Sequence, residues 1–389
     1  MNIPMLDLKA QYASIKDEIN EKVLGVLSAQ NFILGAEVSA LEEEIASYSG
    51  VRFAVGVSSG SDALIISLMA LGIGSGDAVV TTPFTFFATA GAIARLGAKT
   101  IFCDIDPGTY NIDPSSLEQV LLKLQKARRL GRVKAILPVH LYGQVAEMDS
   151  IMKLAGKYDL RVVEDAAQAI GSEYPGHKGV RRAGSIGTLG TLSFYPSKNL
   201  GGYGDGGMVL TDNARLADKL KMLRVHGGIG KYYYRILGGN FRLDALQAAI
   251  LRVKFRHLDD WQQKRRDRAA YYEQKFSASG LTAARQVQTP VAVYKDSGAQ
   301  NFHTYHQYVI RTKDRDKLQA HLKVKGVGTS VFYPLSLHQQ ECFSDLGYKR
   351  GDFPVSEKAA REVLALPIYP ELTAEQQDYI VGCIKEFYG

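Results

Sequence analysis

The first half of the chain alternates between helical and strand-like hydrophobic spacing, and this alternation restricts the possible folds more than any other feature. Apolar residues recur with helical spacing over residues 12–28 and 37–48. Short apolar runs typical of strands lie at 53–57 and 78–82, with a helical stretch at 62–71 between them. This βαβα order predicts an α/β fold with a mostly parallel sheet covered by helices on both faces. Further strands are expected at 100–103, 135–139, 161–164, 191–194 and 207–211.

The last third of the chain has a different pattern, which predicts a second, smaller domain. A long charged helix is expected over residues 252–276, followed by strands at 306–311 and 328–332, a helix between them at 314–325, and a C-terminal helix from about Ala374. A length of 389 residues suits one large and one smaller domain. We therefore expect a large α/β domain at residues 1–255 and a small α+β domain at residues 256–389.

Composition and charge argue against several classes of protein. The net charge of +7 is modest, and the basic residues are spread along the chain, so nucleic acid is not an expected partner. The cysteines, Cys103, Cys342 and Cys383, are few and widely spaced, which favours a reducing cytoplasm over a disulfide framework. No Cys/His group has zinc spacing, so no metal is expected. There is no signal peptide and no apolar run of about 20 residues, so no membrane association is expected either.

Lys198 lies in a segment rich in small residues, Ser193-Phe194-Tyr195-Pro196-Ser197-Lys198-Asn199-Leu200 followed by a glycine-rich run. Thirty-three positions earlier, Asp165 closes an apolar strand. A lysine in a tight loop and an aspartate at a strand end are what a pyridoxal phosphate (PLP) enzyme needs, because the lysine forms an imine with the cofactor and the aspartate keeps the pyridine nitrogen protonated. Taken alone, the loop could be a plain turn, and Asp165 could simply cap the following helix.

Two more segments stand where a strand gives way to a helix. Backbone N–H groups and hydroxyls of Ser58-Ser59-Gly60-Ser61-Asp62 suit an anion such as a phosphate, although an ordinary helix cap is the alternative. Phe86, in Thr82-Pro83-Phe84-Thr85-Phe86-Phe87, could stack on a pyridine ring or belong to the core.

Together these segments resemble the DegT/DnrJ/StrS family of sugar aminotransferases, which are PLP enzymes of fold type I. The resemblance runs nearly end to end and includes Val139-His140-Leu141-Tyr142-Gly143, Glu164-Asp165-Ala166-Ala167-Gln168, Ser193 to Gly207, Gly239-Asn240-Phe241-Arg242-Leu243 and Tyr333-Pro334-Leu335. It implies an aspartate aminotransferase-like large domain with a smaller C-terminal domain, and a homodimer with shared active sites.

The resemblance also implies roles for matching positions. Lys198 would bind PLP and carry the proton, Asp165 would pair with the pyridine nitrogen, Gln168 with the phenolic oxygen, and Phe86 would stack on the ring. Gly60, Ser61 and Ser193 would hold the phosphate, with Asn240 reaching it from the other subunit. The positions expected near a sugar nucleotide are Lys231, Arg242, Tyr333 and His338; Arg242 could equally form a structural ion pair.

The implied reaction has two halves. L-glutamate first gives its amino group to the cofactor, and the amine then passes to a keto group of a UDP- or dTDP-linked sugar, in amino-sugar or lipopolysaccharide biosynthesis. Gln144 is histidine in many relatives, which favours a 3-keto over a 4-keto sugar. A PLP-dependent sugar dehydratase and a non-catalytic regulatory relative of the same fold remain alternatives, but relatives that dehydrate carry histidine where this chain has Lys198.

Overall fold

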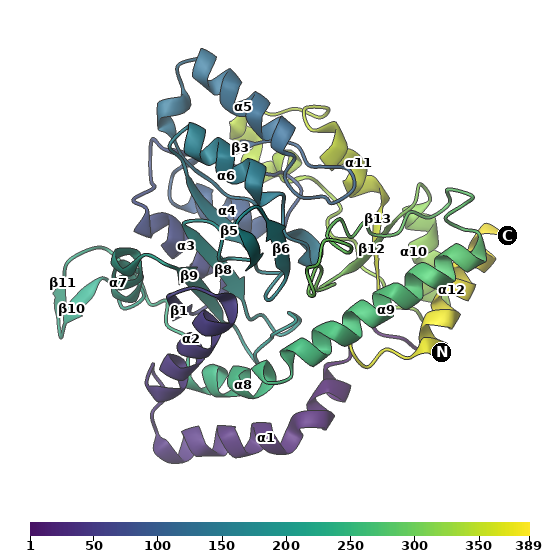
Figure 1. Cartoon of the computed structure of the whole chain (residues 1–389), viewed down its shortest axis with the longest axis horizontal. Coiled ribbons are helices and arrows are strands. Elements are labelled where there is room, and N and C mark those ends of the chain that lie inside the picture. The colour runs from purple at the N-terminus through teal and green to yellow at the C-terminus, as the bar shows by residue number, and fades with distance from the viewer.

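A seven-stranded, mostly parallel sheet forms the centre of the computed structural model, which describes residues 1–389 (Figure 1). Its strands, in spatial order, are β1 (Phe53–Val57), β9 (Gly207–Thr211), β8 (Leu189–Ser193), β5 (Arg161–Asp165), β4 (Val133–Ile136), β2 (Ala78–Thr81) and β3 (Lys99–Phe102). Six of the strands run in the same direction, and β9 runs opposite to them, so that it is antiparallel to both β1 and β8. The predicted fold class is confirmed, and the carboxyl ends of the other six strands meet at one edge, where open α/β sheets bind ligands.

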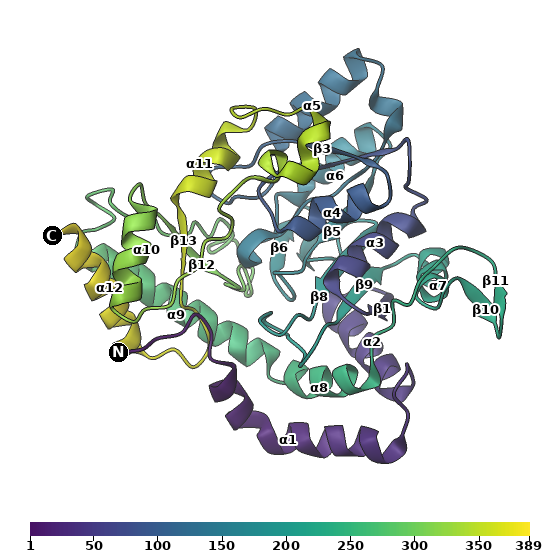
Figure 2. The ribbon, with the colours of Figure 1, turned by 180° about the vertical axis from the view of Figure 1, so that it is seen from behind.

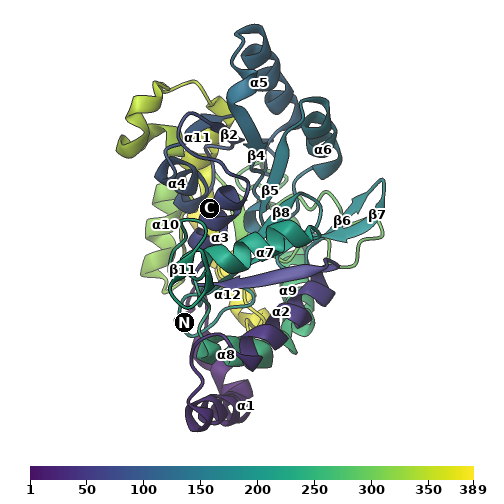
Figure 3. The same cartoon turned by 90° about the vertical axis from the view of Figure 1, so that its left-hand side faces the viewer.

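Helices cover both faces of this sheet, as the alternation of buried side chains along each strand requires (Figure 3). Val80 and Val162 point to a core shared with α2 (Ala36–Ser49), α5 (Pro114–Lys126), α6 (Met148–Lys157) and α8 (Ala245–Phe255). Val79 and Val163 point to the opposite core, shared with α3 (Gly60–Ala70), α4 (Phe87–Arg95) and α7 (Ala214–Leu223). Buried on both faces, the strands read as continuous apolar runs.

The C-terminal part has its own core around a short antiparallel pair. It contains α9 (Leu258–Ser279), β12 (Tyr308–Arg311), α10 (Arg315–Val324), α11 (Pro354–Glu362), β13 (Val363–Leu366) and α12 (Ala374–Tyr388). Ile3 is buried in this core and bridges Val327 in parallel, so the two termini lie near each other in Figure 1. Helix α1 (Leu8–Ala29) then runs back along α8.

Smaller elements decorate this frame. Two hairpins pair β6 (Glu173–Gly176) with β7 (Gly179–Arg182), and β10 (Gly228–Gly230) with β11 (Tyr233–Tyr234). The β10–β11 hairpin projects from the body at the end opposite the termini (Figures 1 and 2). Four 3-10 turns lie at Leu130–Arg132, Leu141–Gly143, Leu337–Gln339 and Glu341–Leu346. No helix combines the length and apolar character that crossing a bilayer requires.

Two predicted elements of the C-terminal part are wrong. The single helix expected over 252–276 is two helices, since α8 ends at Phe255 and α9 begins at Leu258. Between them the His257 N–H donates to the Lys254 carbonyl, three residues earlier, in a tighter turn than that of an α-helix. The strand expected at 328–332 is an extended segment with one isolated bridge, from Ser330 to Ala365. The Gly328 N–H donates instead to the Ile3 carbonyl, and local sequence patterns cannot predict a contact between residues so far apart in the chain.

Candidate active site

A pocket of about 450 Å³ opens at the carboxyl edge of the sheet, and Lys198 lies in its wall. The same wall contains eight of the twelve predicted site residues: Gly60, Ser61, Phe86, Asp165, Gln168, Ser193, Lys198 and Tyr333. They come from the ends of β5 and β8, the starts of α3 and α4, and the C-terminal part. Side chains far apart in the sequence therefore meet where parallel strands end.

The loop that carries Lys198 is closed by its own backbone. The Lys198 N–H donates to the Tyr195 carbonyl and the Gly202 N–H to the Phe194 carbonyl, each at 2.8 Å. Burial lowers the pKa of the Lys198 ammonium to about 8, and the charge of Asp165 partly opposes that shift. At pH 7 a pKa near 8 leaves roughly a tenth of this amine uncharged, far more than for an ordinary lysine, and the uncharged form is the one that acts as a nucleophile and proton acceptor.

Asp165 ends β5 as a buried carboxylate with two donors. The Thr89 hydroxyl donates to Oδ2 at 2.8 Å, and the Ala167 N–H donates to Oδ1 at 3.2 Å. Burial raises the pKa of Asp165, while the Thr89 hydroxyl, the Ala167 N–H and the charge of Lys198 oppose the rise. A cationic ring nitrogen beside this carboxylate would favour its ionised form. Thr89, in α4, was missed by the sequence analysis because nothing local links it to β5.

A second buried carboxylate, Glu164, fixes the end of β5 from the other side. It accepts from His140 Nε2 at 2.8 Å and from the Gly184, Ile186 and Gly187 N–H groups at 2.9, 2.7 and 2.6 Å. Burial alone would raise the pKa of Glu164, but these hydrogen bonds, that from His140 foremost, hold it below its usual value. Because His140 Nδ1 accepts from the Ala146 N–H, the ring carries its proton on Nε2.

The N-terminus of α3 lies where the sequence predicts an anion site. Ser59 caps the helix by accepting the Asp62 N–H at 3.0 Å, and the first-turn N–H groups of Gly60 and Ser61 have no acceptor in the chain. Gly60 lies against Ser193 so closely that an added Cβ would stand 2.6 Å from the serine Cβ. The N–H groups of Gly60 and Ser61 are thus two free donors at the positive end of an 11-residue helix, and both residues line the pocket.

Gln168, Tyr333 and Phe86 form the side of the pocket nearest the C-terminal part. Gln168 Nε2 donates to the Tyr333 hydroxyl at 3.1 Å, and its Oε1 accepts the Tyr142 N–H at 2.7 Å. The Phe86 side chain is 56% exposed, with its ring centroid 6.2 Å from that of Tyr333. An exposed phenyl in the pocket wall offers a face on which a flat ring can stack.

His306, given no site role from the sequence, also lines the pocket. Asn199 donates through Nδ2 to the Thr304 carbonyl at 2.9 Å, so its Oδ1 accepts from His306 Nδ1 at 3.1 Å. The buried ring has a pKa well below its usual value, first because of desolvation and then because of the charge of Lys198. The residue after Lys198 is thus fixed to the C-terminal part by a neutral imidazole. The segment His303-Thr304-Tyr305-His306-Gln307 resembles the family less tightly than the other motifs, so the sequence assigned no role to His306.

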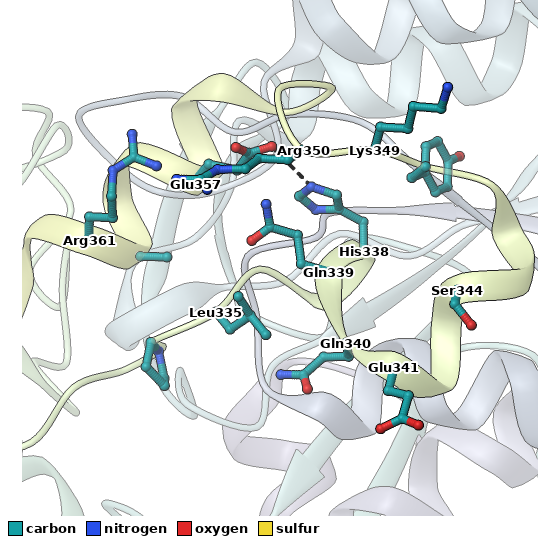
Figure 4. A pocket seen from close by; sticks show the side chains of 13 residues that line it. Leu335, His338, Gln339, Gln340, Glu341, Ser344, Lys349, Arg350, Glu357 and Arg361 are labelled. Carbon is teal, nitrogen blue, oxygen red and sulfur yellow. Dashed lines mark hydrogen bonds and ion pairs between the residues drawn. The ribbon is translucent and has the colours of Figure 1, made fainter.

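Four predicted residues lie outside this pocket. Lys231 and Asn240 are exposed on the β10–β11 hairpin and just after it. Arg242 bridges Val57 through its backbone; it makes no ion pair in the chain, and its buried Nε has no acceptor. His338 lines a separate cavity of about 600 Å³, where its Nε2 lies 3.1 Å from Glu357 (Figure 4).

Gln144, used to choose between keto positions, does not face the pocket. It is buried, its Nε2 donates to the Val291 carbonyl at 3.1 Å, and its Oε1 accepts the Val293 N–H at 2.8 Å. Any effect of Gln144 on the substrate must therefore act through the segment that it holds.

The pocket fits PLP, a pyridine aldehyde with one phosphate. It offers a half-buried amine for the aldehyde, a buried carboxylate for the ring nitrogen, and unpaired N–H donors at a helix start for the phosphate. No group of three or more His, Cys, Asp or Glu side chains is placed to hold a metal ion.

Comparisons with known proteins agree with this chemistry. Residues 13–385 match the model of the DegT/DnrJ/EryC1/StrS aminotransferase family. The chain is 50% identical to a pleiotropic regulatory protein of Geobacillus stearothermophilus, covering 100% of this chain and 99% of that protein. It is 42% identical to a UDP-N-acetyl-3-dehydro-alpha-D-glucosamine 3-aminotransferase of Acidithiobacillus ferrooxidans, covering 98% and 97%.

The fold has a close match among solved structures. A DegT DnrJ EryC1 StrS aminotransferase from Brucella abortus superimposes with a TM-score of 0.91 at 36% identity, covering 100% of both chains. The family match spans the pocket and both parts of the molecule. This chain therefore belongs to the DegT/DnrJ/EryC1/StrS aminotransferase family, whose members are PLP-dependent transaminases.

Proposed function

We propose that this protein transfers the amino group of L-glutamate to the 3-keto group of a UDP- or dTDP-linked sugar. The observation that carries the proposal is the half-buried, unpaired Lys198 amine beside Asp165 in a pocket at the sheet edge. The 3-keto preference is supported by the Acidithiobacillus ferrooxidans relative, which is named for a 3-dehydro sugar. The product would be an amino sugar for a cell-envelope polysaccharide, made in the cytoplasm.

Each residue of the pocket has a task in this proposal. Bound PLP supplies an aldehyde that takes up amines and a ring that withdraws electrons from the carbon bearing the amine. Asp165 holds the ring nitrogen protonated, and the N–H groups of Gly60 and Ser61 hold the phosphate, with Ser193 beside them. Phe86 covers the ring, and Gln168 hydrogen-bonds its phenolic oxygen. Lys198 Nζ removes the proton from the donor carbon and later delivers a proton to the sugar carbon.

The proposed active form is a homodimer of two-domain subunits, divided into residues 1–255 and 256–389. Tyr232 in the β10–β11 hairpin is 77% exposed and Leu237, just after the hairpin, is 92% exposed, which suits a contact with a second copy. Asn240, Lys231 and Arg242 would then complete the partner's pocket. A mixture of the inactive variants Lys198→Ala and Asn240→Ala should regain activity through hybrid dimers with one intact site; no recovery after subunit exchange would refute shared sites.

The test of the reaction is direct. The purified protein reconstituted with PLP should be yellow, its visible band should shift on adding L-glutamate, and borohydride should fix the cofactor on the peptide containing Lys198. Lys198→Ala should lose all three responses. Incubation with UDP- and dTDP-linked 3-keto and 4-keto sugars, read by mass spectrometry, should show conversion of a keto to an amino group in a 3-keto sugar. A colourless protein, or amination of 4-keto sugars alone, would contradict the proposal.

A regulatory role without catalysis is the second candidate, because the Geobacillus stearothermophilus relative is named a regulatory protein. It predicts PLP binding without amination of any sugar in the panel. A dehydratase would instead yield a product with the mass of water lost. The intact pocket, with Lys198 in place, favours amine transfer over both.

A further inference from the structure

A second buried lysine, Lys254 of α8, lies behind the loop that carries Lys198. Its side chain is 1% exposed, and its Nζ donates to the Gly201 carbonyl at 2.7 Å. The ammonium also lies 4.5 Å from the centroid of the Tyr203 ring. It does not line the pocket, and no carboxylate pairs with it. Both polar contacts of the Lys254 ammonium are therefore made to the segment that follows Lys198.

That segment is held tightly enough to transmit a contact to Lys198. A Cβ on Gly201 would stand 2.4 Å from the Pro196 carbonyl oxygen, so the two arms of the loop touch. The Gly202 N–H donates to the Phe194 carbonyl, which ties the far end of the loop to β8. Gln247, two turns earlier in α8, accepts the Tyr203 N–H at 2.8 Å. One face of α8 thus holds the loop at two neighbouring points.

A lysine is an unfavourable choice for this position unless its donor is needed. Burying an ammonium without a carboxylate partner is costly, and burial lowers the pKa of Lys254 to about 8. A methionine would fill similar space without that cost. However, Gly201 is itself buried, and its carbonyl would then lose its donor. What the lysine adds is a fixed donor, aimed at the loop three residues beyond Lys198.

We propose that Lys254 is a positioning residue for Lys198: by holding the Gly201 carbonyl and the Tyr203 ring, it keeps the loop still while the Lys198 side chain exchanges partners. The inference rests on the proposed role of Lys198. It assigns Lys254 no contact with cofactor or substrate, so its loss should impair the use of Lys198 more than the binding of either substrate.

Lys254→Met removes the donor, and Lys219→Met is the matched control, because Lys219 of α7 also donates one hydrogen bond to a backbone carbonyl, that of Ala70 at 2.9 Å. In the full-length protein without added PLP, amide hydrogen exchange over residues 194–204 should speed up at least about tenfold in Lys254→Met. With PLP, kcat should fall about ten- to a hundredfold while KM for glutamate stays within about threefold. Lys219→Met should match the parent protein in both measurements.

Tyr203→Leu provides a second variant at a partly exposed position, should Lys254→Met fold poorly. It keeps the donor, removes the aromatic face, and should change exchange and kcat in the same direction by a smaller factor. Unchanged exchange, unchanged kcat, or a loss confined to KM would overturn the inference. Borohydride labelling of Lys198 in the parent protein separates this outcome from a failure of the proposed function, since labelling there tests Lys198 without reference to Lys254.

Discussion

Thr89→Val should test how Asp165 is kept ionised, because it removes one hydroxyl and little volume. Thr89 is fully buried, and its hydroxyl gives the shorter of the two hydrogen bonds to the Asp165 carboxylate, at 2.8 Å against 3.2 Å. A hydrogen bond to a charged group is worth about 1.5–3 kcal/mol. Since one pKa unit is about 1.36 kcal/mol, the pKa of Asp165 should rise by about one to two units.

The sign of this effect follows from which form the bond favours. The Thr89 hydroxyl donates to the carboxylate and so lowers the pKa of Asp165; without it, burial raises that pKa further. A protonated Asp165 cannot pair with a cationic ring nitrogen. The acid limb of the pH profile of kcat should therefore move to higher pH by about one to two units, and PLP affinity at pH 7 should fall about tenfold.

Fluorescence titration of the apoprotein with PLP and stopped-flow transamination from pH 5 to 9 would measure both effects. Thr100→Val is the matched control, because Thr100 is equally buried in β3 but its hydroxyl has no partner. The control should leave the pH profile and the PLP affinity of the parent unchanged. An acid limb that stays in place in Thr89→Val would refute the reasoning, since the bond would then not contribute to the ionisation of Asp165.

Three further outcomes are expected. The pKa of Lys254 is about 8 in the folded protein against an ordinary value of 10.5, so between these pH values the unfolded chain binds more protons than the folded one. From pH 7 to 11 the free energy of unfolding of the parent apoprotein, measured with urea, should therefore rise by about 3 kcal/mol relative to that of Lys254→Met. No such rise would mean that the amine is not buried in solution. Gly60→Ala should weaken PLP binding in fluorescence titration, because the added Cβ would meet the Ser193 Cβ at 2.6 Å. Adding Ser193→Gly to the same chain should recover part of the lost affinity, whereas adding Ser193→Ala should not. Glu42→Gln should lower the free energy of unfolding by about 3–5 kcal/mol, because it leaves the nearly buried Arg224 without its carboxylate; a loss below 1 kcal/mol in urea unfolding would contradict that reading.

The sequence predicted the parts of the site that depend on one strand end or one helix start. Asp165 closes an apolar strand and Gly60 opens a helix, so local patterns place both at the ligand-binding edge. Thr89 and His306 were missed because each reaches the pocket only when separate segments pack together. No local pattern records a contact across 76 residues such as that of Thr89 with Asp165.

Gln144 illustrates the opposite difficulty. The family resemblance suggested a role for Gln144 in choosing the sugar, yet both ends of its amide are bound to the backbone of residues 291–293. A glutamine whose buried amide joins two backbone segments cannot be distinguished in the sequence from a glutamine that binds a ligand. The break between α8 and α9 at His257 was also not predictable from the sequence, because the helical spacing of apolar residues continues through it.

The bridge between Ile3 and Val327 has a consequence for the order in which the molecule is assembled during synthesis. Ile3 is synthesised before its bridge partner Val327, which follows 324 residues later in the chain. At about 5–20 residues per second, the N-terminal segment waits for roughly 16–65 s before it can be buried. The central sheet, whose strands all lie between Ile3 and Val327, can form within that interval, but the core that contains Ile3 cannot close until Val327 has been made. Native pairing of Ile3 thus reports that synthesis has passed Val327.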